Sequence, residues 1–194
     1  MIIIITPEEI VQNETEIING LFLEGLDLLH IRKPFINNEE MKNFLDQIDS
    51  SYHAQVILHS HYDLGKEYSI SRFHIREKDR LEGLGTHFKN QIISTSVHDV
   101  RMYNKLGKEW EYSFISPVFP SISKKGYGEN TTILENIKDR NNEDVKLIPL
   151  GGINENNIDK AFQSGADGVA LLGAIWNNEQ PLQVFRKCRQ IALS

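Results

Sequence analysis

Residues 146–172 read KLIPLGGINENNIDKAFQSGADGVALL and contain two apolar runs on either side of a helical pattern. The runs 146–150 and 168–172 have the length and the apolar character of strands that are buried on both faces. Residues 155–164, between them, have the pattern of a helix. A strand, a helix and a second strand in this order predict a parallel β–α–β unit.

The same alternation extends over the whole chain. Further strands are expected at 2–6, 26–32, 55–59, 72–76, 91–96 and 112–116. Helices are expected after Thr6, with Thr6 as N-cap and Pro7 at the first position, and then at 38–48, 62–68, 81–88, 98–106, 132–140 and 181–192. Eight strand–helix pairs predict an α/β protein with a single compact (β/α)8 barrel over residues 1–194. An open doubly wound sheet is the alternative.

Composition excludes several classes of partner. The formal net charge of −6 argues against binding to nucleic acid or to an anionic membrane surface, because both rest on a basic field. The four isoleucines at 2–5 lack the basic flank and the length of a signal peptide, and no stretch is long enough to span a bilayer. The single cysteine, Cys188, cannot form an internal disulfide. These features predict a cytoplasmic protein that acts on small molecules.

The carboxyl ends of the expected strands carry most of the polar candidates. In a barrel of this kind the chemistry lies where strands end and loops begin. The residues at those ends are Thr6, His30, Arg32, His59, Ser60, His74, Asp79, Ser96, His98, Ser116, Gly151, Gly152, Leu172 and Gly173. Side chains alternate along a strand, so Arg32 and His30 are expected to point into the barrel mouth and Lys33 toward the helices. Arg32 then either holds a phosphate or carboxylate ligand or pairs with a structural carboxylate.

Two loop types suit small anions. Residues 112–126 read YSFISPVFPSISKKG, in which Pro117 and Pro120 end the strand. Hydroxyl and ammonium groups follow at Ser121, Ser123, Lys124 and Lys125. The second loop type follows the strands expected at 146–150 and 168–172, where Gly151, Gly152 and Gly173 let backbone N–H groups approach a phosphate. A helix N-terminus is expected behind each of these loops.

Metal binding has two candidate sets. His30, His59 and His74 could converge as imidazole ligands, although their spacing does not demand it. Asp79 is the alternative, because a carboxylate beyond a barrel strand can hold magnesium alongside a diphosphate.

Six segments together resemble one known family. They are Leu29-His30-Ile31-Arg32, His74-Ile75-Arg76-Glu77-Lys78-Asp79, Ser96-Val97-His98, Ser116-Pro117-Val118-Phe119-Pro120-Ser121-Ile122-Ser123-Lys124, Leu150-Gly151-Gly152-Ile153 and Gly165-Ala166-Asp167-Gly168-Val169-Ala170. In order and spacing they are similar to thiamine phosphate synthase and its TenI-type relatives over nearly the whole chain.

The resemblance implies a reaction and roles for its residues. Synthases of this family join a thiazole phosphate to a pyrimidine methyl diphosphate, release pyrophosphate and use Mg²⁺. Arg32, Ser96, Ser121, Ser123 and Lys124 would bind the diphosphate, with Arg32 and Lys124 acting in catalysis. Asp79 would bind Mg²⁺. His30, His59 and His74 would contact substrate, and Gly151, Gly152, Leu172 and Gly173 would hold the thiazole phosphate. Lys124→Ala is therefore expected to weaken diphosphate binding more than thiazole phosphate binding. The oligomeric state is left open, with a homodimer as one alternative.

This chain also departs from the synthase pattern. His30 and Pro34 replace the glutamine and the lysine of Gln-x-Arg-x-Lys, and His59-Ser60 replaces an Asn-Asp pair that supplies a second magnesium carboxylate. His-Ile-Arg is closer to the TenI branch, which isomerises the thiazole ring, and His98 would be its acid or base. A second histidine of that branch is Ser116 here. The resemblance thus implies a synthase, with a TenI-like tautomerase and a catalytically silent thiazole or thiamine phosphate-binding protein as alternatives.

Overall fold

A computed structural model describes residues 1–121, 126 and 128–193 of the chain. Its eight parallel strands are β1 (Ile2–Ile5), β2 (Leu28–Ile31), β3 (Val56–Leu58), β4 (Arg72–Ile75), β5 (Ile92–Val97), β6 (Trp110–Ile115), β7 (Lys146–Pro149) and β8 (Val169–Leu171). They form one sheet in the order β7-β6-β5-β4-β3-β2-β1-β8. A parallel bridge from Leu150 to Ala170 joins the two ends of the sheet. The expected (β/α)8 barrel is therefore confirmed.

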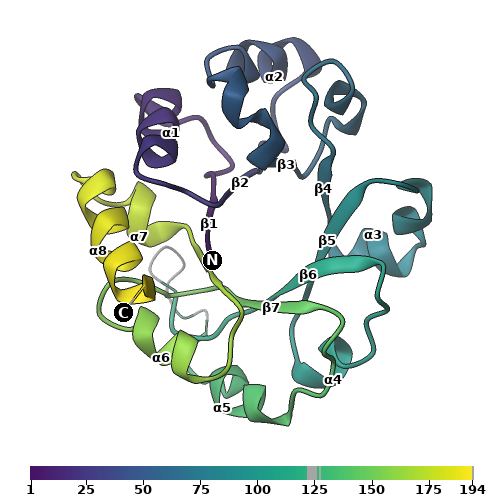
Figure 1. The fold of residues 1–194 in the computed structure, drawn as a ribbon, viewed down its shortest axis with the longest axis vertical. Helices are drawn as coiled ribbons and strands as arrows, with labels where there is room; N and C mark the ends of the chain where they lie inside the picture. The colour runs from purple at the N-terminus through teal and green to yellow at the C-terminus, as the bar shows by residue number, and fades with distance from the viewer. Residues whose placement is uncertain (122–125, 127, 194) are drawn as a thin grey trace.

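Helices lie outside the ring of strands (Figure 1). They are α1 (Glu14–Leu23), α2 (Asn38–Leu45), α3 (Glu77–Leu81), α4 (Val100–Tyr103), α5 (Ile133–Asn136), α6 (Ile158–Gln163), α7 (Gly173–Trp176) and α8 (Pro181–Leu193). Short 3₁₀ helices lie at Ser50–Gln55, Tyr62–Gly65, Leu84–His87 and Ile137–Asp139. The expected helix at 81–88 is instead α3 followed by a 3₁₀ turn, because Gly83 between them has a left-handed φ of 87°.

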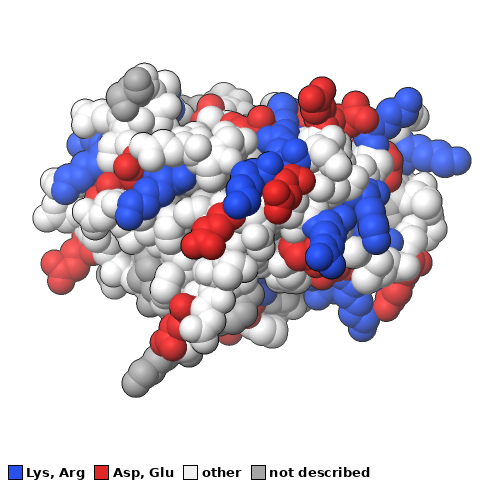
Figure 2. Space-filling view, turned by 90° about the horizontal axis from the view of Figure 1, so that it is seen from below, with Lys and Arg blue, Asp and Glu red and all other residues white. Residues whose placement is uncertain are grey.

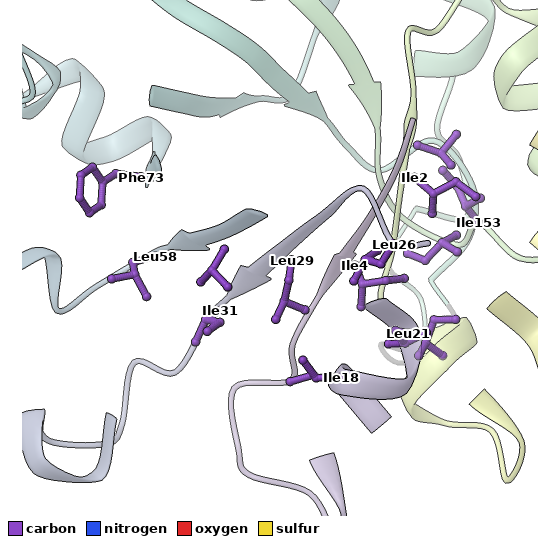
Figure 3. Packing of buried hydrophobic residues seen from close by; sticks show 14 of the residues in the cluster. Ile2, Ile4, Ile18, Leu21, Leu26, Leu29, Ile31, Leu58, Phe73 and Ile153 are labelled. Atoms are coloured by element: carbon purple, nitrogen blue, oxygen red, sulfur yellow. The ribbon is translucent and has the colours of Figure 1, made fainter. Parts of the chain in front are cut away.

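Alternation along each strand divides the buried side chains into two clusters. Ile3 and Ile5 face the barrel interior, where they join Leu28, Ile57, Tyr112, Phe114, Ile148 and Ala170. Ile2 and Ile4 face the helices, in the larger cluster that Figure 3 shows in part. Because side chains of odd and even position lie on opposite sides of a strand, this division fixes which polar residues enter the barrel.

The first helix starts later than expected. Thr6 does not cap it: its buried hydroxyl accepts a hydrogen bond from the backbone N–H of Arg32 at 2.9 Å. Residues 7–12 form a loop instead, and α1 begins at Glu14. The side chain of Lys33 holds this loop, since its Nζ donates to the carbonyl oxygens of Pro7 and Glu9 at 2.8 and 2.7 Å. A contact distant in sequence thus overrides the local capping pattern.

The surface carries charges of both signs. On the face in Figure 2, basic and acidic side chains are interspersed. Within the described residues, no helix has the length and the apolar character needed to cross a bilayer.

Candidate active site

A cavity of about 530 Å³ opens at the carboxyl ends of the strands. Its walls combine apolar and polar side chains from around the barrel: Ile5, Arg32, His59, His74, Arg76, Glu77, Lys78, Ser96, His98, Phe114, Ser116, Ser121, Leu150, Gly151, Gly152, Ile153, Ala170, Leu172 and Gly173. Its volume is in the usual range for small-molecule sites. It is therefore the candidate active site.

Most of the residues singled out from the sequence meet at this cavity. Those that line it are Arg32, His59, His74, Ser96, His98, Ser121, Gly151, Gly152, Leu172 and Gly173. His30 lies beneath the cavity floor and is fully buried, in contact with His59. Ser123 and Lys124 lie outside the described residues. Asp79 is absent from the described wall of the cavity.

Three cationic side chains line the cavity on the side of β2 and β4. Arg32 follows β2, as expected from strand alternation, and forms an ion pair with Glu8. Arg76 follows β4, and its Nε donates to Asp79 Oδ2 at 2.7 Å. Lys78, in α3, is the third. Arg76 and Lys78 were not predicted as site residues, although the former has the same alternation as His74, two residues earlier.

His98 lies at the rim, with 55% of its side chain exposed. Its Nδ1 donates to the carbonyl oxygen of Ser116 at 2.8 Å, so that Nε2 is the nitrogen left to accept a proton. That Nε2 lies 3.8 Å from the carboxylate of Glu77. This geometry allows His98 to act as a general acid or base. Because the ring is half-exposed and its described anchor is one hydrogen bond, its orientation is only loosely fixed.

Gly151 and Gly152 form the opposite wall, after β7. Their φ values of 104° and 69° lie in the left-handed region. Among the described residues, none accepts a hydrogen bond from the backbone N–H of either glycine, while the Gly151 carbonyl accepts from Phe119 N at 3.1 Å. α6 begins only at Ile158 and has six residues, so the expected helix N-terminus does not stand directly behind this loop. Any anion here would be held by the backbone amides themselves.

Gly152→Ala is expected to destabilise the fold and to disturb this wall. A Cβ at this position would lie 2.2 Å from the Pro120 carbonyl oxygen and 2.7 Å from Phe119 Cβ. The matched control is Gly165→Ala, which has a left-handed φ of +93° and nothing within 4 Å of its Cβ. In the control, the free energy of unfolding should fall only by the about 1–2 kcal/mol that a left-handed backbone costs a residue with a Cβ. Urea unfolding should show a larger loss for Gly152→Ala, and equal losses would contradict the close approach.

Three histidines from adjacent strands converge at the cavity, where His59 and His74 line the wall and His30 is buried behind them. His30 Nδ1 lies 2.7 Å from His59 Nε2, and the rings of His59 and His74 stack with centroids 4.3 Å apart. His30 Nε2 lies 2.6 Å from the Tyr112 hydroxyl, and His74 Nδ1 lies 3.0 Å from Ser94 Oγ. Burial lowers the pKa of all three rings, for His74 to about 3. All three are therefore neutral at physiological pH.

The described residues do not fit the magnesium site that the sequence resemblance implies. Both carboxylate oxygens of Asp79 accept hydrogen bonds from Arg76, at 2.7 and 3.2 Å. Glu77 lines the cavity, but its Oε1 accepts from Arg80 at 3.3 Å. Ser60, at the end of β3, lies 2.8 Å from His61 Nδ1 rather than in the described wall of the cavity. Mg²⁺ prefers several oxygen ligands in octahedral geometry, and this donor set does not supply them.

Several thiamine phosphate synthases are similar to this chain in sequence or in structure. A thiamine-phosphate synthase of Clostridium tetani is 24% identical over 183 residues, which cover 91% of this chain and 85% of the relative. One of Staphylococcus epidermidis is 26% identical over 135 residues, which cover 68% and 63%. The solved structure of thiamine phosphate pyrophosphorylase from Bacteroides thetaiotaomicron superposes with a TM-score of 0.81 at 27% identity, covering 98% of this chain and 96% of that one.

The family model described as "Thiamine monophosphate synthase" matches residues 2–175, which contain every described strand and the whole cavity wall. Nearly the full length of the barrel is therefore accounted for by one family. The chain belongs to the thiamine monophosphate synthase family.

Proposed function

We propose that this chain is a thiamine phosphate synthase, which couples a hydroxymethylpyrimidine diphosphate to a hydroxyethylthiazole phosphate. The observation that carries the proposal is the division of the cavity between two anion-binding walls. Arg32, Arg76 and Lys78 provide cations from β2, β4 and α3, and the glycine loop after β7 lies on the other side of the ring. A cavity with two such walls suits two phosphorylated substrates held face to face.

The reaction breaks the bond between the pyrimidine methylene carbon and the diphosphate oxygen, and the electron pair leaves with pyrophosphate. The lone pair of the thiazole nitrogen then forms the new carbon–nitrogen bond, which gives thiamine phosphate. Guanidinium groups near the leaving diphosphate stabilise the negative charge that develops on it. Ile5, Phe114 and Ile153 add apolar wall, which limits the access of water to the reactive cation.

When Mg²⁺ binds together with such a substrate, it neutralises part of the negative charge of the diphosphate. No step here is assigned to it, because Asp79 is engaged by Arg76 and the end of β3 carries His59 and Ser60. The residues proposed to bind the diphosphate are Arg32, Arg76, Lys78, Ser96 and Ser121, together with Ser123 and Lys124 from the sequence. Gly151, Gly152 and Gly173 are proposed to hold the thiazole phosphate.

One assay separates this proposal from its alternatives. Purified protein is given both phosphorylated substrates and magnesium chloride, and thiamine phosphate and pyrophosphate are quantified by chromatography. Equal amounts of the two products support a synthase. Conversion of the thiazole tautomer without thiamine phosphate would replace the proposal with a TenI-like tautomerase. Neither reaction, with thiazole phosphate binding detected by calorimetry, would leave a silent binding protein.

His98→Ala is expected to lower kcat for thiamine phosphate formation by less than about tenfold, whereas a true general acid or base contributes about 10²–10⁴. The proposed coupling requires no proton transfer by His98, and among the described residues the ring is anchored by one hydrogen bond, to the Ser116 carbonyl. Steady-state kinetics with saturating substrates measure the change. A loss of a thousandfold, with binding intact, would place His98 in the chemistry.

We also propose that the enzyme works in the cytoplasm. Cys188 is a free, buried thiol, which fits a reducing compartment.

A further inference from the structure

We propose that His30, His59 and His74 form a binding site for a divalent transition metal ion of the zinc type in the wall of the cavity. One ring nitrogen of each histidine lies within 4.8 Å of the corresponding nitrogen of the other two. The three residues come from β2, the end of β3 and β4, which are neighbours in the sheet. A rigid barrel wall therefore holds all three ligands, which is the arrangement that metal sites need.

The distances suit a metal ion, but the rings of His59 and His74, which now stack at 25°, must turn so that the plane of each passes through it. Zinc bonds to imidazole nitrogen at about 2.0–2.1 Å, so two nitrogens of a tetrahedral site lie roughly 3.3 Å apart. His30 Nδ1 and His59 Nε2 are 2.7 Å apart, and none of the three candidate ligand atoms is farther than 4.8 Å from another. His30 Nδ1 and His59 Nε2 now share one proton in their hydrogen bond. A metal ion bound to both nitrogens replaces that proton, and the neutral ring of His59 then carries its proton on Nδ1.

Oxygen partners already orient two of the rings. The His30 nitrogen opposite the cluster, Nε2, lies 2.6 Å from the Tyr112 hydroxyl. His74 Nδ1 lies 3.0 Å from Ser94 Oγ, which leaves Nε2 as its ligand atom. Metal-binding histidines usually donate their second N–H to an oxygen, which fixes the tautomer and the ring orientation.

The coordination sphere has one open side. His30 is fully buried, whereas His59 and His74 line the cavity. Three histidines and an exchangeable fourth ligand are typical of catalytic rather than structural zinc. Arg32 and Arg76 line the same cavity as His59 and His74, so an anionic fourth ligand would offset the concentrated positive charge. Three imidazoles favour zinc-type ions over Mg²⁺, which agrees with His59-Ser60, without a carboxylate, at the end of β3.

The link to substrate rests on the proposed function, because the anion that reaches this position would be the diphosphate. The site itself does not rest on it. Binding of the metal alone can be measured without either substrate, so a failure of the synthase assay and a failure of the metal site are separate results.

The test uses the full-length protein, freed of metal by a chelator and titrated with Co²⁺ alone. We expect one equivalent to bind, with the visible absorption of four-coordinate Co²⁺, and to be displaced by one equivalent of Zn²⁺. His59→Ala should weaken binding by about 100-fold or more, since even the loss of an outer-shell partner costs about 10–100-fold. His87→Ala, which removes an exposed histidine of the 3₁₀ helix Leu84–His87, should leave binding unchanged.

X-ray absorption of the wild-type zinc complex gives a second measurement that does not depend on a variant. Three nitrogen ligands would support the site. The absence of stoichiometric binding, a shell of oxygen ligands alone, or equal affinities of His59→Ala and His87→Ala would overturn it. Inorganic pyrophosphate should tighten Co²⁺ binding and change its spectrum. If the metal binds through three histidines and pyrophosphate has no effect, the link to the diphosphate is overturned.

Discussion

Lys33→Met is expected to lower the free energy of unfolding by about 3–5 kcal/mol, because it leaves a buried carboxylate without its partner. Lys33 and Glu14 have side chains that are 0% and 1% exposed, and Nζ lies 2.8 Å from the carboxylate. Burial lowers the pKa of Lys33 and raises that of Glu14, which shows how much the pair depends on mutual neutralisation. The same ammonium group also holds the loop after β1 through the carbonyl oxygens of Pro7 and Glu9.

Urea unfolding followed by circular dichroism measures this effect. The matched control is Lys42→Met, which breaks an exposed pair with Glu67 and should change the stability little, because exposed ion pairs contribute little. The double variant Lys33→Met/Glu14→Leu removes both charges and should recover much of the stability, since replacing a buried pair by apolar residues is often neutral. Equal stability of Lys33→Met and the Lys42→Met control would contradict this account.

Arg32→Met and Arg76→Met are each expected to lower kcat/KM for thiamine phosphate formation by about 10²–10³, the usual cost of losing one preorganised donor. Both guanidinium groups line the cavity, and each has further N–H donors for an entering diphosphate beyond those that pair with Glu8 and Asp79. Arg32→Lys should show an intermediate loss, because it keeps the charge but loses the bidentate geometry.

Calorimetry should show that the two methionine variants bind thiazole phosphate as the wild type does. Arg186→Met serves as control, since it removes a guanidinium that pairs with Glu24 far from the cavity, in α8. If Arg32→Met and Arg76→Met stay within threefold of that control, the diphosphate is held elsewhere.

The barrel and the composition of its mouth could be predicted from the sequence because both follow local rules. Apolar runs at regular intervals specify the strands, and alternation places Arg32 in the mouth and Lys33 toward the helices. The same rule applied to His74 would also have identified Arg76. The position of Asp79 beyond β4 predicts a magnesium ligand, whereas in the structure its carboxylate pairs with Arg76 within one helical turn.

The features that could not be predicted from the sequence depend on contacts between residues that are far apart in the chain. Thr6, Pro7 and Glu9 form a sound capping pattern, yet the ammonium group of Lys33 holds them as a loop. The histidines are 29 and 15 residues apart, at positions 30, 59 and 74, and only the curvature of the barrel brings their ring nitrogens within 4.8 Å. The spacing of the three histidines in the sequence therefore did not determine whether their rings converge.

Phosphorus NMR of the wild-type protein with both phosphorylated substrates tests the central proposal most directly, because it follows the diphosphate and the monophosphate in one sample. The account predicts that the diphosphate signals disappear while pyrophosphate and thiamine phosphate signals grow in equal amounts, and that Arg32→Met slows both changes together. Diphosphate signals that persist with the folded wild-type protein, or pyrophosphate that appears without thiamine phosphate, would contradict it.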